Sequence, residues 1–358
     1  MIFTKLKKQQ ILLFFAISFF GNFYAQDTFA GIEIGSKGVK ISIIDVENAR
    51  KSVYSIKDFW TVNVGIAKGI SIDGKLADAD IEHAGAVVLE NYNKLISVHK
   101  ISADKIFIVA SSGVGMATNT AVLVNKIKAL TNKNIEVIES KLEAKLLYRG
   151  CIPPKLFSNS VLVDIGGGNT KGGYAELIND NLIFFPLNLN LGTITLTEKI
   201  NKRTDGVTLE RYIDENFKFQ NELQTEVLNT LNQRPQIKTR PNVYLSGGAA
   251  WAFYTLYNNG VASENFNELT LNDVRDYDAM VKNNFHKFVA LSQTNPEVER
   301  VLKTYSQKHL ISANNLLLAS MENLDNLEGK KFYFVKNGQI AWLLSYIADS
   351  AKGAKVMY

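Results

Sequence analysis

Cysteine, histidine and long apolar runs are all scarce in this chain, and each scarcity excludes a class of protein. The 358 residues include one cysteine, Cys151, so no disulfide can form within the chain. The histidines are scattered without the spacing typical of metal ligands, at His83, His99, His286 and His309. Lysine and arginine total 40 against 35 acids, and the lysines are interspersed with acids, so no nucleic-acid-binding stripe is predicted.

One apolar run stands out at the start of the sequence. Residues 11–20 are apolar, follow three lysines within the first eight residues, and are too few to span a bilayer. A basic start before a short apolar segment is typical of a secretory signal peptide, with cleavage expected near Ala25. The sequence therefore predicts a signal peptide over residues 1–25 and a periplasmic or secreted protein without a stable membrane span. An uncleaved N-terminal anchor is the alternative.

The rest of the chain contains the same pattern twice: a buried strand, a glycine turn and a returning strand. The first copy runs from Phe29 into residues 39–45, and the second runs from Ser160 into residues 171–176. Pro153-Pro154 marks the break between them. We predict an α/β protein of two duplicated domains, residues 27–150 and 151–358, with mixed sheets flanking a central cleft. The last helix is able to pack back on the first domain.

Glycine turns at strand ends are suited to phosphate. Backbone N–H groups without side chains approach an anion closely, and a concave row of amides holds it. An acid precedes two of the turns, Glu33 before Gly35-Ser36 and Asp164 before residues 166–168. Such a carboxylate can hold a metal ion or position a water. A third turn, Gly247-Gly248, ends a further predicted strand. One such turn is equally compatible with a structural hairpin, but three in this order favour a phosphate-binding cleft.

Several segments resemble motifs of the exopolyphosphatase/guanosine pentaphosphate phosphohydrolase family. The family's Ile-Ser-Gly-x-Glu-Glu-Ala-Arg-Leu-Ile-Tyr-x-Gly stretch is similar to Ile138-Glu-Ser-Lys-Leu-Glu143-Ala-Lys-Leu-Leu-Tyr-Arg-Gly150. Its Val-Asp-Ile-Gly-Gly-Gly-Ser-Thr-Glu motif is similar to Val161-Leu-Val-Asp-Ile-Gly-Gly-Gly-Asn-Thr170. Two further family segments resemble Leu191-Gly-Thr-Ile-Thr-Leu-Thr-Glu198 and Leu245-Ser-Gly-Gly248. The resemblance covers nearly the whole chain after the apolar run.

This resemblance implies two duplicated actin-like (ribonuclease H-like) domains and hydrolysis of a terminal phosphoanhydride, in polyphosphate or guanosine pentaphosphate, usually with Mg²⁺. Glu143 takes the position of the glutamate that activates the attacking water. Asp164 takes that of the aspartate that helps to hold the metal or the water, and Glu33 is a second candidate metal ligand. The residues predicted to bind phosphate are Gly35, Ser36, Lys37, Lys40, Gly166, Gly167, Gly168, Asn169, Thr170, Lys171, Gly247 and Gly248.

Four of the chain's departures from the family pattern bear on phosphate and metal binding. Lys37 stands in the first glycine turn where the family has asparagine, and Gly115 and Thr195 stand where it has arginines. Lys171 replaces an acid. A lysine cannot ligate magnesium, and exchanging a carboxylate for an ammonium changes the local charge by two units. Each unit is worth about 3 kcal/mol at about 5 Å and an effective dielectric near 20.

Three functional hypotheses follow. In the first, Lys37, Lys40 and Lys171 replace the lost arginines and a metal ion, and the protein is a working phosphoanhydride hydrolase acting on polyphosphate or a related substrate. The survival of Glu143 and Asp164 favours it. In the second, catalysis has decayed and the protein is a receptor that binds phosphate or polyphosphate. The third, an actin-like small-molecule kinase, would need ATP, which an exported protein does not meet. A homodimer is compatible with each of them.

Overall fold

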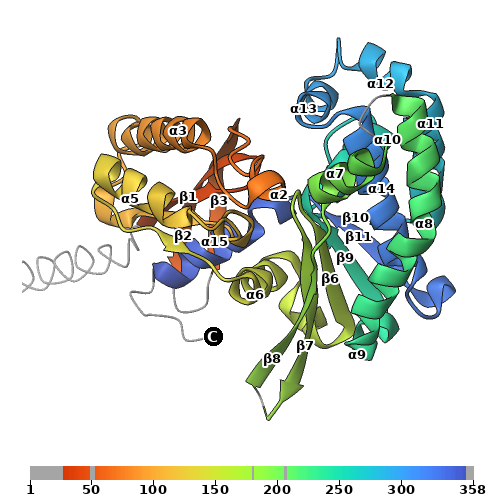
Figure 1. Ribbon diagram of the computed structural model, residues 1–358. Coiled ribbons are helices and arrows are strands. Elements are labelled where there is room, and N and C mark those ends of the chain that lie inside the picture. Colours follow the sequence, from red (N-terminus) through yellow and green to blue (C-terminus); the bar gives the residue numbers. More distant parts are fainter. Residues whose placement is uncertain (1–26, 49–52, 180, 205–207, 352–358) are drawn as a thin grey trace, which may run out of the picture.

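The computed structural model describes residues 27–48, 53–179, 181–204 and 208–351. The predicted signal peptide therefore lies outside the described residues. Figure 1 shows two lobes, the first coloured red to yellow and the second green to blue, each built on one mixed β-sheet. Within the described ranges, no helix is both long enough and apolar enough to cross a membrane.

The first sheet has the strand order β3-β2-β1-β4-β5. Strand β1 runs antiparallel to β2 and parallel to β4, so the predicted hairpin is present. Its strands are β1 (Asp27–Ile34), β2 (Gly38–Asn48), β3 (Val53–Asn63), β4 (Ile106–Ala110) and β5 (Glu136–Val137). The helices of this lobe are α2 (Ile70–Asp73), α3 (Asp78–Ser97), η2 (Ala103–Lys105), α4 (Ser112–Gly115) and α5 (Thr120–Thr131).

The second sheet repeats this order as β8-β7-β6-β9-β11 and adds the edge strand β10. Strand β6 is antiparallel to β7 and parallel to β9, as β1 is to β2 and β4, so the two lobes share one topology. Its strands are β6 (Ser160–Ile165), β7 (Thr170–Ile178), β8 (Asn181–Leu189), β9 (Asn242–Ser246), β10 (Phe266–Leu269) and β11 (Lys331–Val335). Its helices are η3 (Pro154–Asn159), α7 (Thr193–Arg203), α8 (Leu209–Asn232), α9 (Pro235–Thr239), α10 (Gly247–Tyr257), α11 (Leu271–Asn283), α12 (Phe285–Leu291), α13 (Pro296–Thr304), α14 (Gln307–Glu322) and η4 (Leu327–Gly329).

Two helices, α6 (Ser140–Cys151) and α15 (Gly338–Ser350), lie against each other where the lobes meet (Figure 1). Helix α15 also packs on β1 and β2, although it follows the last strand of the second sheet. Glycines make this approach possible. A Cβ atom at Gly31 would lie 2.7 Å from the Ile347 side chain, and one at Gly150 would lie 2.6 Å from a backbone carbonyl oxygen of α15. The Arg149 guanidinium also bonds both carboxylate oxygens of Asp349, at 2.6 and 3.0 Å.

Alternation along the first strand of each sheet decides which side chains point toward the cleft. Successive side chains of a strand point to opposite faces. Ile32 of β1 packs among the apolar residues of α3, and Val163 of β6 packs among those of α8, α10 and α14. The next residues along these strands, Glu33 and Asp164, therefore point to the opposite faces, toward α15 and α6. The sequence pattern thus brings one buried acid from each lobe to the same junction.

Candidate active site

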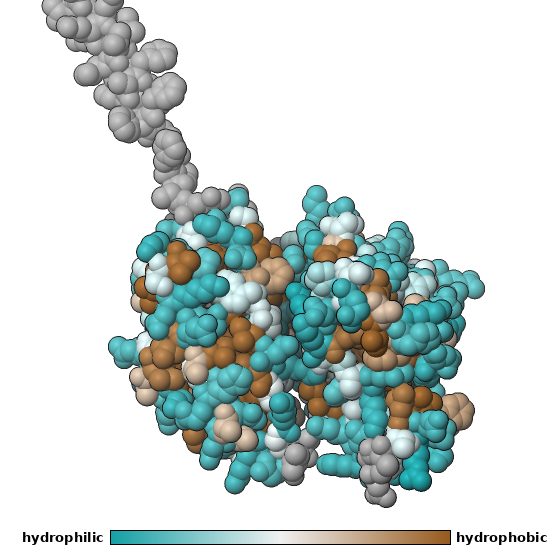
Figure 2. Space-filling model, turned by 90° about the horizontal axis from the view of Figure 1, so that it is seen from above, coloured by the Kyte–Doolittle hydropathy of each residue, from teal (hydrophilic) through white to brown (hydrophobic). Residues whose placement is uncertain are grey.

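A cleft of about 480 Å³ lies between the two lobes and is visible as a furrow in Figure 2. Fourteen of the fifteen predicted site residues line this cleft: Glu33, Gly35, Ser36, Lys37, Lys40, Glu143, Asp164, Gly166, Gly167, Gly168, Asn169, Lys171, Gly247 and Gly248. Thr170 does not line it. The buried Thr170 hydroxyl donates to the Leu191 carbonyl at 2.7 Å and so fixes the base of its turn.

The first glycine turn joins β1 to β2, and two of its residues, Ser36 and Lys37, line the cleft. The Gly35 N–H donates to the Gly38 carbonyl at 2.9 Å, which closes the turn. The carbonyl of Lys37 accepts from the N–H groups of residues 64 and 65, at 3.0 and 2.9 Å, which fixes the outer side of the loop. In the described part of the chain, the N–H groups of Ser36 and Lys37 have no protein acceptor. These two amides are therefore available to an anion.

The second glycine turn joins β6 to β7 in the same way. The Gly166 N–H donates to the Asn169 carbonyl at 3.0 Å, and the first amides of α7 donate to the carbonyls of Gly166 and Gly167, both at 2.8 Å. The carbonyls of Gly166 and Gly167 are thus occupied by the start of α7. Among the described residues, no protein acceptor is found for the N–H groups of Gly167 and Gly168. Two amide pairs, one from each lobe, therefore line the same cleft.

Two of the departures from the family pattern have a local structural explanation. The Thr195 hydroxyl accepts from the Gly192 N–H at 2.8 Å and donates to the Gly168 carbonyl at 3.0 Å, so Thr195 caps α7 and braces the second glycine turn. At Gly115, a Cβ atom would lie 2.9 Å from the Val137 side chain. An arginine at position 115 would need this packing to move.

The third glycine turn connects β9 to α10 and lies next to Asp164. Gly247 has a φ of 86°, and a Cβ atom there would lie 2.8 Å from a carboxylate oxygen of Asp164. At Gly248, a Cβ atom would lie 1.9 Å from the Tyr305 hydroxyl. Ser246, just before this turn, donates its hydroxyl to Asp164 Oδ1 at 2.8 Å. Glycine is required here because strand, helix and acid approach one another closely.

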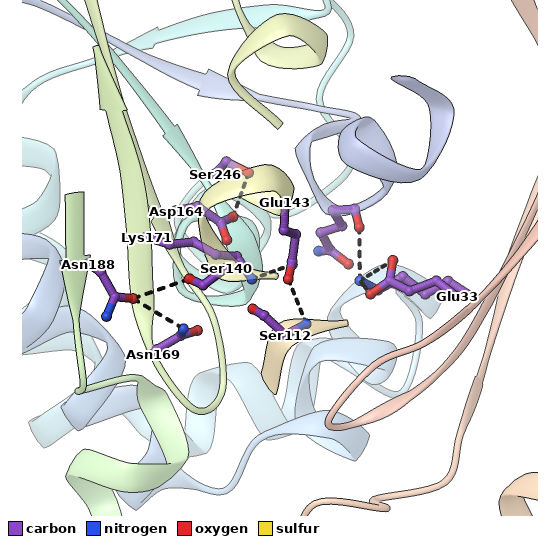
Figure 3. A network of polar contacts seen from close by, with 11 residues as sticks. Glu33, Ser112, Ser140, Glu143, Asp164, Asn169, Lys171, Asn188 and Ser246 are labelled. Carbon is purple, nitrogen blue, oxygen red and sulfur yellow. Dashed lines mark hydrogen bonds and ion pairs between the residues drawn. The ribbon is translucent and has the colours of Figure 1, made fainter. Parts of the chain in front are cut away.

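A lysine stands directly opposite the acid in each lobe. Glu33 of β1 faces Lys40 of β2 in the antiparallel register, and Asp164 of β6 faces Lys171 of β7. The Lys40 ammonium lies 3.0 and 3.2 Å from the two oxygens of Glu33 and donates to the Gln339 carbonyl at 2.9 Å. The Lys171 ammonium bonds instead to the carboxylate of a third acid, Glu143 on α6 (Figure 3). The duplicated hairpins therefore carry duplicated acid–lysine pairs.

Glu143 is bonded by both lobes. Its side chain is 2% exposed and lies in the first turn of α6. The Ser112 N–H donates to Oε2 at 2.8 Å, and Lys171 donates to Oε1. Burial works to raise the pKa of Glu143, but the Lys171 ammonium and these hydrogen bonds outweigh it and hold the pKa below its usual range. Burial alone would lower the pKa of Lys171, whereas the charges of Glu143 and Asp164 raise it.

The other two acids are shifted in the opposite direction. Burial raises the pKa of Asp164, although Lys171 and the Ser246 hydroxyl work against this rise. Burial also raises the pKa of Glu33, with Lys40 again opposing it. A buried carboxyl with a raised pKa and one with a lowered pKa, side by side, is an arrangement typical of sites that transfer protons.

Lys37 crosses the cleft from the first lobe to the second. Its ammonium donates to the Thr304 carbonyl at 3.1 Å and lies 4.3 Å from the centroid of the Tyr305 ring. Within the described residues, no carboxylate is paired with it. Burial, together with the nearby charge of Lys68, lowers the pKa of Lys37 to about 8. Lys37 is thus a partly buried cation that an anionic ligand can reach.

The Mg²⁺ expected from the resemblance does not fit the acids of this chain. Magnesium needs oxygen ligands in near-octahedral geometry, usually carboxylates and waters. In the described ranges, no group of three or more acids, histidines or cysteines is placed to hold a metal ion. Glu33 and Glu143 are each bonded to a lysine, and Asp164 accepts a hydrogen bond from the Ser246 hydroxyl.

Three residues that shape the site were not among the sequence predictions. Ser246 is the last residue of β9 and pairs with Asp164 across parallel strands, so a correct strand order would have indicated it. Ser112 lies three residues before Gly115, and its backbone N–H rather than its side chain bonds Glu143. Tyr305 carries no local signal, because it comes from a helical region far along the chain.

Comparisons with known proteins agree on one family. The sequence model of the Ppx/GppA phosphatase family matches residues 53–258. A guanosine-5'-triphosphate,3'-diphosphate pyrophosphatase of Pseudoalteromonas translucida is 26% identical over 179 residues, 49% of this chain and 34% of that protein. Its counterpart in Photobacterium profundum is 23% identical over 192 residues, covering 53% and 35%. The match thus spans about a third of the length of these curated relatives.

Solved structures resemble nearly the whole chain. An exopolyphosphatase from Cytophaga hutchinsonii superposes with a TM-score of 0.70 at 17% identity, covering 93% of this chain and 100% of that one. The Aquifex aeolicus Ppx/GppA family member gives a TM-score of 0.66 at 19% identity, covering 92% and 99%. The predicted fold class, two duplicated actin-like domains of α/β type, is confirmed. Enzymes of the matched family hydrolyse phosphoanhydrides and generally depend on divalent metals.

Proposed function

This chain belongs to the Ppx/GppA phosphatase family, and from that premise we propose that it is an exported hydrolase that releases terminal phosphate from polyphosphate or a related phosphoanhydride. One observation supports the proposal above all others. The amide pairs of residues 36–37 and 167–168 line the same cleft as the buried acids Glu143 and Asp164. Such a cleft can grip a phosphate chain by its oxygens while a carboxylate faces the terminal phosphorus.

The reaction needs an in-line water, a base and positive charge on the phosphate oxygens. The water oxygen forms a new bond to the terminal phosphorus as the bridging P–O bond breaks, and the water proton passes to a carboxylate. The shortened chain leaves with the electron pair of the broken bond. Backbone amides and Lys171 are the groups of this chain that stabilise the charge on the equatorial oxygens.

Glu143 is the proposed base, and Lys171 controls when it can act. While Lys171 is bonded to it, Glu143 is a weak base because its pKa is held low. A phosphate chain in the cleft offers the Lys171 ammonium another anionic partner. Release from Lys171 raises the basicity of Glu143, which then accepts the proton from water. Asp164, held by Ser246, orients the water.

The test is release of inorganic phosphate from polyphosphate by the purified mature protein. Glu143→Gln should lower kcat by about 100-fold or more, the usual effect of losing a general base. Glu139→Gln is the matched control, because Glu139 is exposed at the start of the same helix. Its kcat should stay within about twofold, as for other surface substitutions. Equal losses in both variants, or full activity without Glu143, would refute the assigned role.

A second candidate function is a receptor that binds phosphate chains without cleaving them. The observation in its favour is that both oxygens of Glu143 are already bonded in the resting protein, to Ser112 and Lys171. Tight calorimetric binding of polyphosphate with no phosphate release over hours would support the receptor. Guanosine pentaphosphate tested in parallel would show whether a nucleoside is required.

Export and assembly are part of the same proposal. The basic start and the apolar residues 11–20 are the grounds for export. Mass spectrometry of the N-terminus of protein recovered from the cell envelope would test cleavage near Ala25. A homodimer is the proposed assembly, and light scattering of the mature chain would distinguish it from a monomer.

A further inference from the structure

We propose that the ammonium groups of Lys40 and Lys171 take the place of a divalent cation in this cleft, so that the protein handles phosphate chains in their metal-free form. The inference rests on the proposed function, since it concerns the same cleft and the same class of ligand. It differs from the general metal dependence of the family, and the reason lies in how the acids of this chain are paired.

The duplication supplies a lysine for each lobe. In both lobes the acid is the next-to-last residue of the first strand of the hairpin, and the lysine follows it by seven residues on the second strand. Residues directly opposite in an antiparallel pair share a face of the sheet, so acid and lysine point into the cleft together. A site built around a metal ion would place free carboxylates on these faces. Here each face carries its own positive charge.

A metal ion would have to displace these lysines. Lys40 bonds both oxygens of Glu33, and Lys171 bonds Glu143. The side chain of Lys171 is 10% exposed, and that of Glu143 is 2% exposed. An ammonium removed from its carboxylate in so dry a place would be left without compensation. Mg²⁺ also gives up its own water reluctantly. The lysines therefore compete with a metal ion for the carboxylates of Glu33 and Glu143 and exclude it.

The Lys171 ammonium can also bind phosphate oxygens in the way that a metal cation would. An ammonium has three N–H donors. One of them is used by Glu143, and no second acceptor for Lys171 is found among the described residues. The remaining donors belong to a side chain that lines the cleft together with Gly167 and Gly168, whose amides are open. The Lys40 ammonium donates to Glu33 and to the Gln339 carbonyl, so its role is to balance the negative charge of Glu33 in the first lobe.

The deciding experiment titrates the purified mature protein with Mg²⁺ alone and then with Mn²⁺ alone, followed by calorimetry and by thermal unfolding. We expect no saturable heat and no shift of Tm at millimolar metal, because a bound ligand would raise Tm. In the second arm, inorganic phosphate is titrated in EDTA and in Mg²⁺. Its dissociation constant should agree within about twofold between the two, since uncoupled ligands do not change each other's affinity.

Stoichiometric metal uptake by the free protein would overturn the inference. So would a gain of about tenfold or more in phosphate affinity on adding Mg²⁺. These outcomes are separate from the fate of the proposed function. Phosphate release from polyphosphate that requires Mg²⁺ would keep the hydrolase and refute the lysine substitution. Phosphate binding that is unchanged by EDTA, with no hydrolysis of polyphosphate, would refute the hydrolase and support the replacement of the metal ion by lysines.

A charge reversal sharpens the comparison. Lys171→Glu would place a third carboxylate beside Glu143 and Asp164, so this variant should acquire saturable Mg²⁺ or Mn²⁺ uptake and a metal-dependent rise in Tm. Lys218→Glu is the matched control, because Lys218 is 71% exposed on α8 and away from the cleft. It should take up no metal. If Lys171→Glu does not fold, the two arms on the unaltered protein still decide the question.

Discussion

The pair formed by Lys171 and Glu143 should be strongly coupled in the folding energy of the protein. Lys171→Met removes the ammonium, keeps most of the side-chain volume, and leaves a buried carboxylate with the Ser112 N–H as its remaining partner. At about 4 Å and an effective dielectric near 20, the lost attraction is about 4 kcal/mol. Breaking a buried pair in other proteins costs about 3–5 kcal/mol. We therefore expect the free energy of unfolding to fall by about 3 kcal/mol or more.

The measurement is a double-mutant cycle in urea, followed by tryptophan fluorescence and by circular dichroism. Lys171→Met combined with Glu143→Gln removes both charges and should recover most of the loss, with a coupling energy of about 2 kcal/mol or more. The matched control is the surface pair Lys199 and Glu226, whose side chains are each 36% exposed and whose charged atoms lie 3.2 Å apart. Its coupling should be about 0–1 kcal/mol. Additive losses at Lys171 and Glu143, or a loss below about 1 kcal/mol for Lys171→Met, would refute the reasoning.

The pH dependence of this pair follows from the same contacts. Because the folded pKa of Glu143 is lowered, its contribution to stability is present above the pKa of an unfolded glutamate and is lost as the pH falls through the folded pKa. The pKa of Lys171 is raised, so its contribution is present below the unfolded lysine pKa and is lost as the pH rises through the folded one. The coupling energy should thus be constant across neutral pH and decline at both ends.

Three further predictions concern other contacts of the cleft. The affinity of the protein for inorganic sulfate should fall by up to about tenfold per pH unit above the Lys37 pKa of about 8. Calorimetry on the Lys37→Met variant should show no such pH dependence. A pH dependence that survives in this variant would contradict the role of the Lys37 ammonium. Gly248→Ala should cost about 1–3 kcal/mol of unfolding free energy, because the new Cβ would lie 1.9 Å from the Tyr305 hydroxyl. Adding Tyr305→Phe should restore most of that loss in urea unfolding, and no restoration would disprove the clash. Ser246→Ala should raise the pKa of Asp164 further, and the acidic limb of the kcat profile should move up by about one pH unit; an unmoved limb would exclude Asp164 from the step.

The duplicated hairpins could be predicted from the sequence because their signals are local. A buried strand, a glycine turn and an acid at a fixed position lie within ten or so residues of one another in each lobe. Strands β3 and β8 were not predicted, and both are edge strands of their sheets, where burial is incomplete. Pro186 within β8 also argues against a strand by composition, yet an edge strand tolerates a missing N–H.

The candidate site was predictable in its parts but not in its pairing. Glu143, Asp164 and the glycine turns came from motifs, and the seven-residue spacing of Glu33 and Lys40 was visible in the sequence. The sequence did not show that Lys171 would bond to Glu143 rather than to Asp164, because this pairing depends on where α6 begins relative to β7. Contacts such as that of Lys37 with Tyr305 join distant segments, and no local pattern encodes them.

The two oxygens of Glu143 are bonded to opposite halves of the molecule, one to Ser112 behind β4 and the other to Lys171 on β7. The single side chain of Glu143 on α6 therefore links the two lobes. When the halves swing apart, one of its bonds must break and a buried charge loses its partner. An incoming polyanion that offers Lys171 a new partner removes this obstacle, so ligand arrival and hinge motion are tied to one and the same carboxylate.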